Sequence, residues 1–232
     1  MPTNITKPAA AADFRHIDAW IFDLDNTLYR ADSKLFAQID ARMTRYIADH
    51  LQVSDAEAHR LQHDYYERLG STLSGLMSFH DVDPEHFLAD VHDIDLTLIA
   101  RDEALIGAVE KLPGKRLVFT NGCRRHAERV LERVGLSHAI DTIWDIRAGG
   151  FTPKPDRRTY ERLIASAGIA PKSAAMFEDM ARNLAPAHAL GMTTVWLNPA
   201  SPASEQDGPG LRAGHIHHEI DDLADFLHAI RL

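Results

Sequence analysis

Short runs of hydrophobic residues alternate with stretches of helical periodicity along this chain. Four runs, rich in β-branched and aromatic residues, predict strands at residues 19–24, 116–120, 174–177 and 193–197, and a weaker fifth lies at 140–146. Strands that are apolar throughout, rather than at every second position, are typical of a parallel sheet buried on both faces. The pattern therefore predicts an α/β fold.

One long interval breaks this alternation. Roughly 90 residues separate the first strand from the second, although a strand–helix–strand crossover needs only about 30. Within the interval Leu35, Ile39 and Met43 lie on one stripe at the spacing of an amphipathic helix. Residues 31–112 are therefore predicted to be an inserted, all-helical subdomain.

Local signals indicate where the inserted helices begin. Ser33 is placed to cap the first of them, and Ser54 with Glu57 has the spacing of a capping box for the next. Pro84 suits the first position of a later helix, where its missing N–H costs nothing. These signals predict several short helices rather than one long one.

The rest of the chain, residues 17–30 and 113–232, is predicted to form the sheet core. Residues 1–16 lack the apolar centre of a signal peptide and are predicted to be a disordered tail. Residues 199–214, rich in Pro, Gly and Ser, are predicted to be a surface loop. A last strand at 216–220, followed by a helix, closes the predicted fold.

The composition narrows the class of function. The chain has 232 residues and a formal net charge of −9, whereas an extended nucleic-acid surface favours the opposite sign. Cys123 is its one cysteine, and its apolar runs fall short of the roughly 18 residues that a membrane span needs. We therefore expect a cytoplasmic protein whose partner is neither a nucleic-acid polymer nor a membrane.

The first chemical signal is a pair of carboxylates directly after the first predicted strand. Asp23 and Asp25 are two residues apart, in the segment Asp-Leu-Asp-Asn-Thr that ends at Thr27. Ligand sites of open α/β sheets lie beyond the carboxyl ends of the strands. Two such carboxylates repel each other unless a cation lies between them, and Mg²⁺ prefers oxygen ligands. The alternative is an ordinary acidic turn.

Three further signals follow later strands. Thr120, Asn121 and Gly122 open a helix, where a hydroxyl and free N–H groups form an anion cradle. Lys154 lies between two prolines, which limit its backbone. Glu178 and Asp179, with Asn183 four residues after Asp179, end another strand. Singly these are an ordinary turn, an exposed lysine and an acidic helix cap, but together they predict one site for a metal and a phosphate.

In this order the residues resemble the haloacid dehalogenase superfamily, whose phosphatases show DxDxT, then Ser or Thr, then Lys, then an acidic pair. The resemblance covers residues 20–198 and implies a Rossmann-like sheet with a helical cap of the first type, inserted after the first motif. Within the superfamily the chain is similar to the pyrimidine 5′-nucleotidase-like branch. The stretches that carry this similarity are DLDNTLY, YYERLGSTLSGL, VHDIDL, FTNG followed by His126-Ala127, FEDMARNL and GMTTV.

The resemblance implies a magnesium-dependent phosphate-monoester hydrolase, with UMP and CMP as the expected substrates. Asp23 would attack phosphorus to give an aspartyl-phosphate, and Asp25, with a raised pKa, would act as acid and then base. The resemblance further implies that Mg²⁺ is bound by Asp23, the Asp25 main-chain carbonyl and Asp179. The phosphoryl oxygens would be bound by Thr120, the Asn121 backbone N–H and Lys154. Asn183 would orient Lys154 or Asp179 from outside the site, where Thr27 and Glu178 also lie.

Residues of the inserted helices are candidates to contact the leaving group. They are Tyr66, Arg68, Thr72 and His80, with Tyr65 and Ser71 beside them. Aromatic pairs at helical spacing more often serve packing. The histidines at 215–218 are expected on a solvated strand rather than at a transition metal. Cys123 is expected to be a packed side chain with His126 as its nearest base.

Other functions are open at this point. A sugar-phosphate phosphatase or phosphomutase shares the core motifs, and a 2-haloacid dehalogenase uses the first aspartate on carbon without a metal. A phospho-accepting regulator or binding protein is the non-enzymatic alternative. The acidic residue at position 25 and the long insertion favour phosphoryl transfer to or from a small-molecule phosphate monoester. The oligomeric state stays open.

Overall fold

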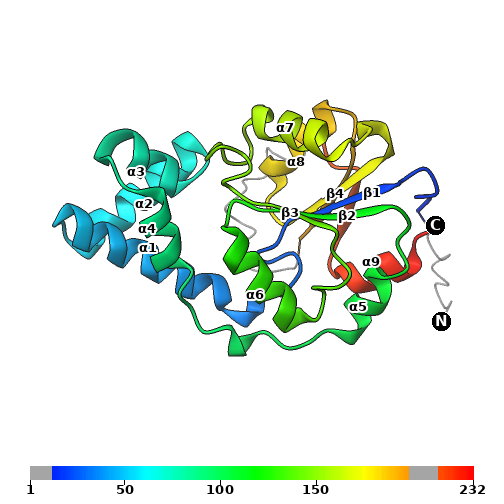
Figure 1. Ribbon diagram of the computed structural model, residues 1–232, viewed down its shortest axis with the longest axis horizontal. Coiled ribbons are helices and arrows are strands. Elements are labelled where there is room, and N and C mark those ends of the chain that lie inside the picture. Colours follow the sequence, from blue (N-terminus) through cyan, green and yellow to red (C-terminus); the bar gives the residue numbers. More distant parts are fainter. Residues whose placement is uncertain (1–11, 199–213) are drawn as a thin grey trace, which may run out of the picture.

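The computed structural model describes residues 12–198 and 214–232. Its strands form one parallel sheet in the order β3-β2-β1-β4-β5-β6 (Figure 1). The strands are β1 (Ala19–Phe22), β2 (Lys115–Phe119), β3 (Thr142–Trp144), β4 (Ala174–Glu178), β5 (Thr193–Leu197) and β6 (His218–Ile220). Each predicted strand lies within two residues of an observed one, so the predicted α/β class and parallel sheet are confirmed.

Helices cover both faces of the sheet, and four others lie at one end of it (Figure 1). The helices at the end are α1 (Leu35–Leu51), α2 (Asp55–Leu69), α3 (Thr72–His80) and α4 (Pro84–Val91). One face carries α5 (Glu103–Val109), α6 (Arg124–Val134) and α9 (Leu223–Ala229), and the other carries α7 (Arg157–Ala167) and α8 (Ala181–Ala189). We call α1–α4 the helical cap and the remainder the sheet core.

Strand β1 is apolar along its whole length because it is buried on both faces. Trp20 and Phe22 point into the layer of α5, α6 and α9, whereas Ala19 and Ile21 point into the layer of α7 and α8. Both layers consist of packed apolar side chains, so each residue of the strand is buried. Phe22 pairs with residues of β2 and β4, and the carboxyl ends of these three strands are therefore level.

The ends of the cap helices follow their sequence signals with one exception. The Ser54 hydroxyl accepts a hydrogen bond from the Glu57 N–H, and Pro84 is the first residue of α4. Ser33 is not the cap of α1, because Lys34 in a left-handed conformation holds that position. The Ser33 hydroxyl still accepts a hydrogen bond from the Leu35 N–H.

Two predicted boundaries need correction. Phe14 is buried and stacks on Trp20 at 5.8 Å, so the predicted tail of residues 1–16 continues into packed structure at its end. Residues 1–11 of that tail lie outside the described residues, as do 199–213 of the predicted surface loop. Helix α5 falls within the predicted insertion of 31–112, but Leu105 and Ile106 pack in the sheet core.

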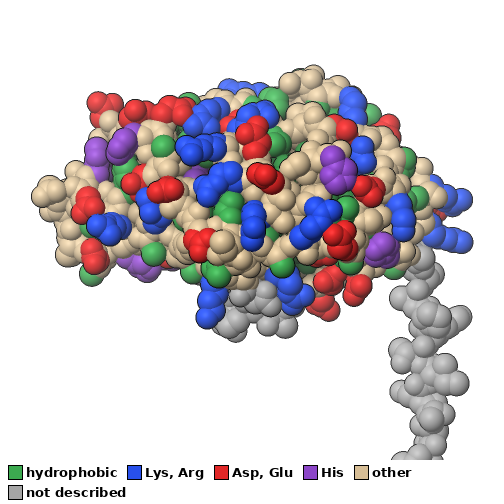
Figure 2. All heavy atoms as spheres, turned by 60° about the horizontal axis from the view of Figure 1, so that its bottom comes forward, with side chains coloured by type: hydrophobic (Ala, Val, Ile, Leu, Met, Phe, Trp, Pro, Cys, Tyr) green, Lys and Arg blue, Asp and Glu red, His purple; other side chains and the backbone are tan. Residues whose placement is uncertain are grey.

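The surface carries charges of both signs. Lysine and arginine side chains alternate with aspartate and glutamate on the face drawn in Figure 2, without a continuous basic patch there. Among residues 12–198 and 214–232, no helix combines the length and the apolar character that crossing a bilayer requires.

Removal of the Phe14 ring tests the packing of the N-terminal segment. We expect Phe14→Ala to lower the free energy of unfolding by about 3 kcal/mol, because the ring leaves a cavity against Trp20. Denaturant unfolding measures the change. Phe36, which is 41% exposed, is the control, and its alanine variant should lose less than about 1 kcal/mol. Equal losses would contradict the placement of Phe14.

Candidate active site

Lys154 lies at the centre of the site, at the level of the carboxyl ends of β1, β2 and β4. Its ammonium donates to Asp23 Oδ1 at 2.5 Å, to Glu178 Oε2 at 2.7 Å and to the Phe119 carbonyl at 2.9 Å. The side chain is 2% exposed. Burial alone would lower the pKa of Lys154, but the charges of Asp23 and Glu178 raise it above its usual value. The ammonium therefore stays charged.

The backbone of Lys154 is held by the loop that follows β2. The Asn121 side chain accepts a hydrogen bond from the Lys154 N–H at 2.8 Å and donates one to the Lys154 carbonyl at 3.2 Å. The sequence predicted a role for the Asn121 backbone and missed this amide clamp. It fixes Lys154 relative to the turn that contains Thr120, the predicted phosphate ligand.

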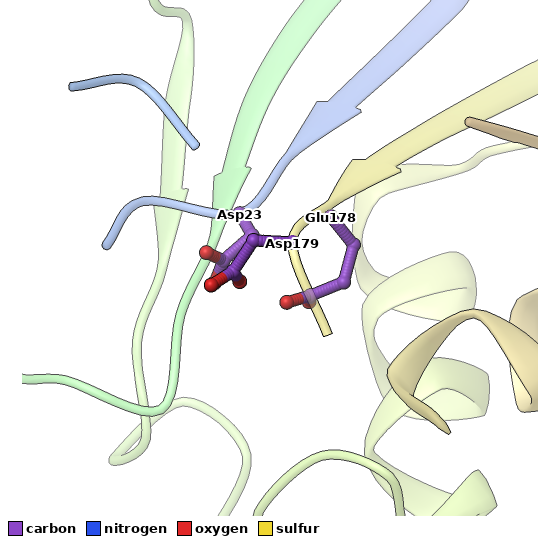
Figure 3. A group of neighbouring side chains, drawn as sticks. All are labelled: Asp23, Glu178 and Asp179. Carbon is purple, nitrogen blue, oxygen red and sulfur yellow. The ribbon is translucent and has the colours of Figure 1, made fainter. Parts of the chain in front are cut away.

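Three carboxylates meet around this lysine. One oxygen from each of Asp23, Glu178 and Asp179 lies within 4.8 Å of the others. In Figure 3 the carboxylates of Asp23 and Asp179 lie side by side, and that of Glu178 lies a little apart from them on the same side of the strand ends. The Trp196 indole N–H donates to the main-chain carbonyl of Asp179 at 2.7 Å, and the Asn26 amide donates to its carboxylate at 3.4 Å.

These carboxylates are short of positive charge. Burial, together with Glu178 and Asp25, raises the pKa of Asp23 to about 7 despite the nearby Lys154. Burial and the charges of Glu178 and Asp23 raise the pKa of Asp179 well above its usual range. A divalent cation between Asp23 and Asp179 would relieve this repulsion, and the all-oxygen donor set fits Mg²⁺. The Asp25 carbonyl, which accepts no hydrogen bond from the described residues, is free to join them.

Asp25, two residues after Asp23, has hydrogen-bond partners of its own. Its Oδ1 accepts from the Tyr29 hydroxyl and is bonded to His126 Nε2, both at 2.8 Å. Burial raises the pKa of Asp25, but the opposing effects of His126, His92 and Tyr29 leave the pKa below its usual value. The expectation of a raised pKa was therefore wrong for this state, because the sequence does not show His126 beside Asp25.

The hydroxyl of Thr120 is presented by a tight turn. Its oxygen accepts a hydrogen bond from the Gly122 N–H at 2.9 Å, which leaves its proton for a ligand. An added Cβ at Gly122 would meet that oxygen at 3.2 Å, tighter than most contacts. Thr27 is buried with its hydroxyl lacking a partner in the described structure.

The predicted contact of Asn183 with Lys154 or Asp179 is absent among the described residues. The main-chain carbonyl of Asn183 accepts a hydrogen bond from the Tyr160 hydroxyl. The side-chain Oδ1 of Asn183 is buried without a partner among the described residues. The three hydrogen bonds of the Lys154 ammonium already use its three protons. No donor on the ammonium is left for Asn183 in this arrangement.

The comparison with known families decides the class of this site. A sequence model of the haloacid dehalogenase-like hydrolases matches residues 17–191, which include every core motif described above. The chain belongs to this hydrolase family. The match extends from the segment before β1 to the end of α8.

Individual relatives agree with this assignment. Phosphate metabolism protein 8 of Saccharomyces cerevisiae is 28% identical over 194 residues, or 76% of this chain, which spans 60% of that protein's length. A HAD phosphatase from Thermococcus onnurineus shares the fold at a TM-score of 0.59 and 19% identity, over 93% of this chain and 100% of its own. L-2-haloacid dehalogenase from Xanthobacter autotrophicus also shares the fold, at a TM-score of 0.57 and 14% identity. That match covers 91% of this chain and 97% of the dehalogenase.

The cap of this family member contacts the sheet core at several points. The Tyr66 ring lies 3.8 Å from the Arg182 guanidinium. Gly70 lies against the Lys154 carbonyl and the rings of Pro153 and Pro155. Glu85 of α4 forms a two-bonded ion pair with Arg147, in the loop after β3. The cap is therefore closed onto the edge that carries Lys154.

Most of the candidate leaving-group residues have partners inside the cap. The Tyr65 hydroxyl is 2.6 Å from His80 Nε2, Arg68 pairs with Asp64, and the Thr72 hydroxyl donates to a backbone carbonyl. Ser71 caps α3. Of these candidates, Tyr66 is the one for which a contact with a core side chain is described.

A polar cavity of about 420 Å³ opens between α4 and α6, and sequence reasoning missed it. It is lined by Arg42, Glu85, His86, Leu88, Ala89, Asp90, His92, Asp93, Cys123, Arg125, His126, Arg129 and Arg147. Cys123 is buried as expected, but its sulfur lies 3.4 Å from Nδ1 of His92 rather than beside His126. The signal that could have revealed His92 is its place in the VHDIDL stretch.

The histidines at 215–218 make contacts within the protein. His215 and His217 bond to the Ala181 carbonyl and to Thr194, which ties β6 to its neighbours. Within the described residues, the group of Asp23, Glu178 and Asp179 is the one with the spacing of metal ligands.

The raised pKa of Asp23 makes the effect of Mg²⁺ on stability depend on pH. An unfolded aspartate ionises near pH 4, so keeping this buried carboxylate protonated lowers the folded state's stability progressively as the pH rises from about 4 to 7. Mg²⁺ needs the ionised form. We therefore expect Mg²⁺ to raise the melting temperature more at pH 8 than at pH 5, as measured by thermal unfolding.

Asp179→Asn provides the control for this measurement. It removes one carboxylate with little change in shape, so the stabilisation by Mg²⁺ at pH 8 should largely disappear. The same rise in melting temperature at both pH values, or in the variant, would contradict the assignment of these carboxylates as the metal ligands.

Proposed function

We propose that the protein is a magnesium-dependent phosphate-monoester hydrolase that acts through an aspartyl-phosphate on Asp23. The observation that carries this proposal is the convergence of Asp23 and Asp179 on one position beside the Lys154 ammonium. The two carboxylates repel each other and would be stabilised by a bound metal ion. The metal ion and the fixed Lys154 ammonium would together bind an anionic substrate.

Asp23 is the nucleophile in this scheme. Its carboxylate oxygen attacks phosphorus, and the bond from phosphorus to the leaving oxygen breaks. The Thr120 hydroxyl donates to one phosphoryl oxygen. The Lys154 ammonium redirects its hydrogen bond from Asp23 Oδ1 to another as the nucleophile forms its new bond.

Asp25 carries the proton in both halves of the reaction. The negative charge of a bound phosphoryl group raises the pKa of this carboxyl from its lowered value in the free protein. Protonated Asp25 then gives its proton to the leaving oxygen and releases the alcohol. Ionised Asp25 next takes a proton from the water that attacks phosphorus, which frees Asp23 and inorganic phosphate.

Asp23, Asp179 and the Asp25 carbonyl would hold the magnesium ion. When bound, it neutralises the carboxylate pair and the charge that develops on the phosphoryl oxygens. The Glu178 carboxylate has a different task, because its bond to Lys154 sets the position of the ammonium.

The proposed substrates are pyrimidine nucleoside 5′-monophosphates. This narrower assignment comes from the sequence resemblance in the first motif, in YYERLGSTLSGL and in VHDIDL. The name of the yeast relative is consistent with phosphate chemistry. A 2-haloacid dehalogenase has the same fold, but its leaving halide needs no proton, so the carboxyl group of Asp25 favours phosphoryl transfer.

Asp23→Asn tests the nucleophile. We expect phosphate release to fall below detection, because an amide oxygen does not form the acyl-phosphate. The fold should be retained and the melting temperature at pH 8 unchanged or raised, since the variant removes a buried carboxylate whose ionisation is unfavourable. Turnover by a clean preparation of this variant would refute the assignment.

A screen of phosphate esters tests the substrate class. Phosphate release should be fastest from UMP and CMP, slower from AMP and GMP, and slow from sugar phosphates, and a chelator should abolish all of it. Indifference to the base would refute the nucleotidase assignment but leave the phosphatase intact. Activity that is unaffected by the chelator would contradict the role of magnesium.

A further inference from the structure

His126 occupies the first turn of α6, and its side chain is fully buried. The helix start is fixed by Asp145, whose carboxylate accepts a hydrogen bond from the Arg124 N–H. This register places His126 Nε2 at 2.8 Å from Asp25 Oδ1, across 101 residues of sequence. A side chain that the fold positions so firmly constrains the group it touches.

The hydrogen bonds to Asp25 fall on one of its two oxygens. Oδ1 takes both the Tyr29 hydroxyl and His126 Nε2, whereas Oδ2 has no hydrogen-bond partner in the described part of the chain. Two bonds on Oδ1 prevent the carboxyl group from rotating. They leave Oδ2 as the oxygen that exchanges a proton with the leaving group or with water.

Packing alone does not account for a histidine at position 126, because one of its ring nitrogens is left unpaired. Its Nδ1 is buried without a hydrogen-bond partner in the described structure, and leaving a buried polar atom unpaired destabilises the folded state. A leucine would fill the space without that cost. The bond from Nε2 to Asp25 is the feature that an apolar residue could not supply.

A second histidine connects this arrangement to the cap. The His92 ring, just after α4, stacks on the His126 ring at 4.5 Å between centroids and 16° between planes. Its Nδ1 lies 3.0 Å from the Leu88 carbonyl, which ties it to α4. The same helix carries Glu85, the partner of Arg147 in the core. The His126 ring is therefore backed by the closed cap.

We propose that His126 is a positioning residue that holds Asp25 with Oδ2 toward the reacting oxygen, and that His92 maintains this position when the cap is closed. The proposal rests on the proposed phosphatase function and adds to it two residues and a connection between cap closure and acid/base chemistry.

The chemistry of the leaving group separates this role from a structural one. An alkyl or nucleoside oxygen must be protonated as it leaves, whereas the stable anion of 4-nitrophenol leaves without a proton. A misplaced Asp25 therefore slows formation of the aspartyl-phosphate from an alkyl ester but not from 4-nitrophenyl phosphate. With the aryl ester, slow hydrolysis of the intermediate appears instead as a burst of nitrophenol.

The test compares His126→Leu with His126→Gln in rapid-quench kinetics on both esters. His126→Leu should slow transfer from the alkyl ester by about 10- to 100-fold, which is less than the roughly 10²–10⁴-fold lost with the acid itself, because Asp25 is still present but held less firmly. Transfer from the aryl ester should change little, and so should the dissociation constants of both esters, taken from the concentration dependence of the transfer rate. His126→Gln keeps an N–H at the place of Nε2 and should recover most of the rate.

His92→Leu and His86→Leu form a matched pair. Both histidines line the same cavity, but His86 bonds to the Tyr46 hydroxyl instead of contacting His126. His92→Leu should show the same dependence on leaving group at smaller magnitude, and His86→Leu should show none. This pair carries the test if His126→Leu fails to fold, which thermal unfolding monitors.

Two results would overturn the proposal. In one, folded His126→Leu, or His92→Leu in its place, slows both esters equally or neither. In the other, His126→Leu lowers the aryl-ester transfer rate further in a protein that already carries Asp25→Asn, because residues that act through one group should not add. If the unaltered protein releases phosphate from neither ester, the proposed function itself fails.

Discussion

The ammonium of Lys154 joins three parts of the chain that are far apart in sequence. Its hydrogen bonds reach Asp23 after β1, the last carbonyl of β2 and Glu178 at the end of β4. Each buried charge would be prohibitive alone, and removing one partner of such a group leaves the others unpaired. The spacing of the strand ends, and so the geometry of the site, depends on this cation.

The same arrangement leaves the site with excess negative charge. Lys154 is shared by Asp23 and Glu178, and Asp179 adds a third carboxylate, so burial and mutual repulsion raise the pKa values of Asp23 and Asp179. A folded protein retains such a group of charges where a bound cation or an anionic ligand with its metal relieves it. The excess negative charge of the site and its proposed ability to bind Mg²⁺ therefore come from the same three carboxylates.

Much of the fold and the site followed from the sequence, because parallel strands place their carboxyl ends at one edge. Continuous apolar runs located the strands, and that edge rule grouped Asp23, Thr120, Lys154 and Asp179. The rule says nothing about side chains that reach the site from helices. Their direction depends on helix register and on how the cap packs, which a pattern of apolar residues does not encode.

The residues and pKa shifts that were not predicted depend on helix register and cap packing. His126 touches Asp25 through the register of α6, and His92 reaches His126 through the closed cap. The pKa of Asp25 was expected to rise because its partners were not visible in the sequence. Phe14 was assigned to a tail because a single aromatic residue carries no periodicity.

The central claim is that Asp23 becomes phosphorylated during turnover. Acid quenching in the steady state, followed by borohydride reduction, converts an acyl-phosphate of aspartate to homoserine, which peptide mass spectrometry locates. We expect homoserine at position 23 when substrate and Mg²⁺ are both present, and unmodified aspartate when either is omitted. Turnover with Asp23 unmodified under every quench condition, or homoserine at position 25 or 179 instead, would contradict it.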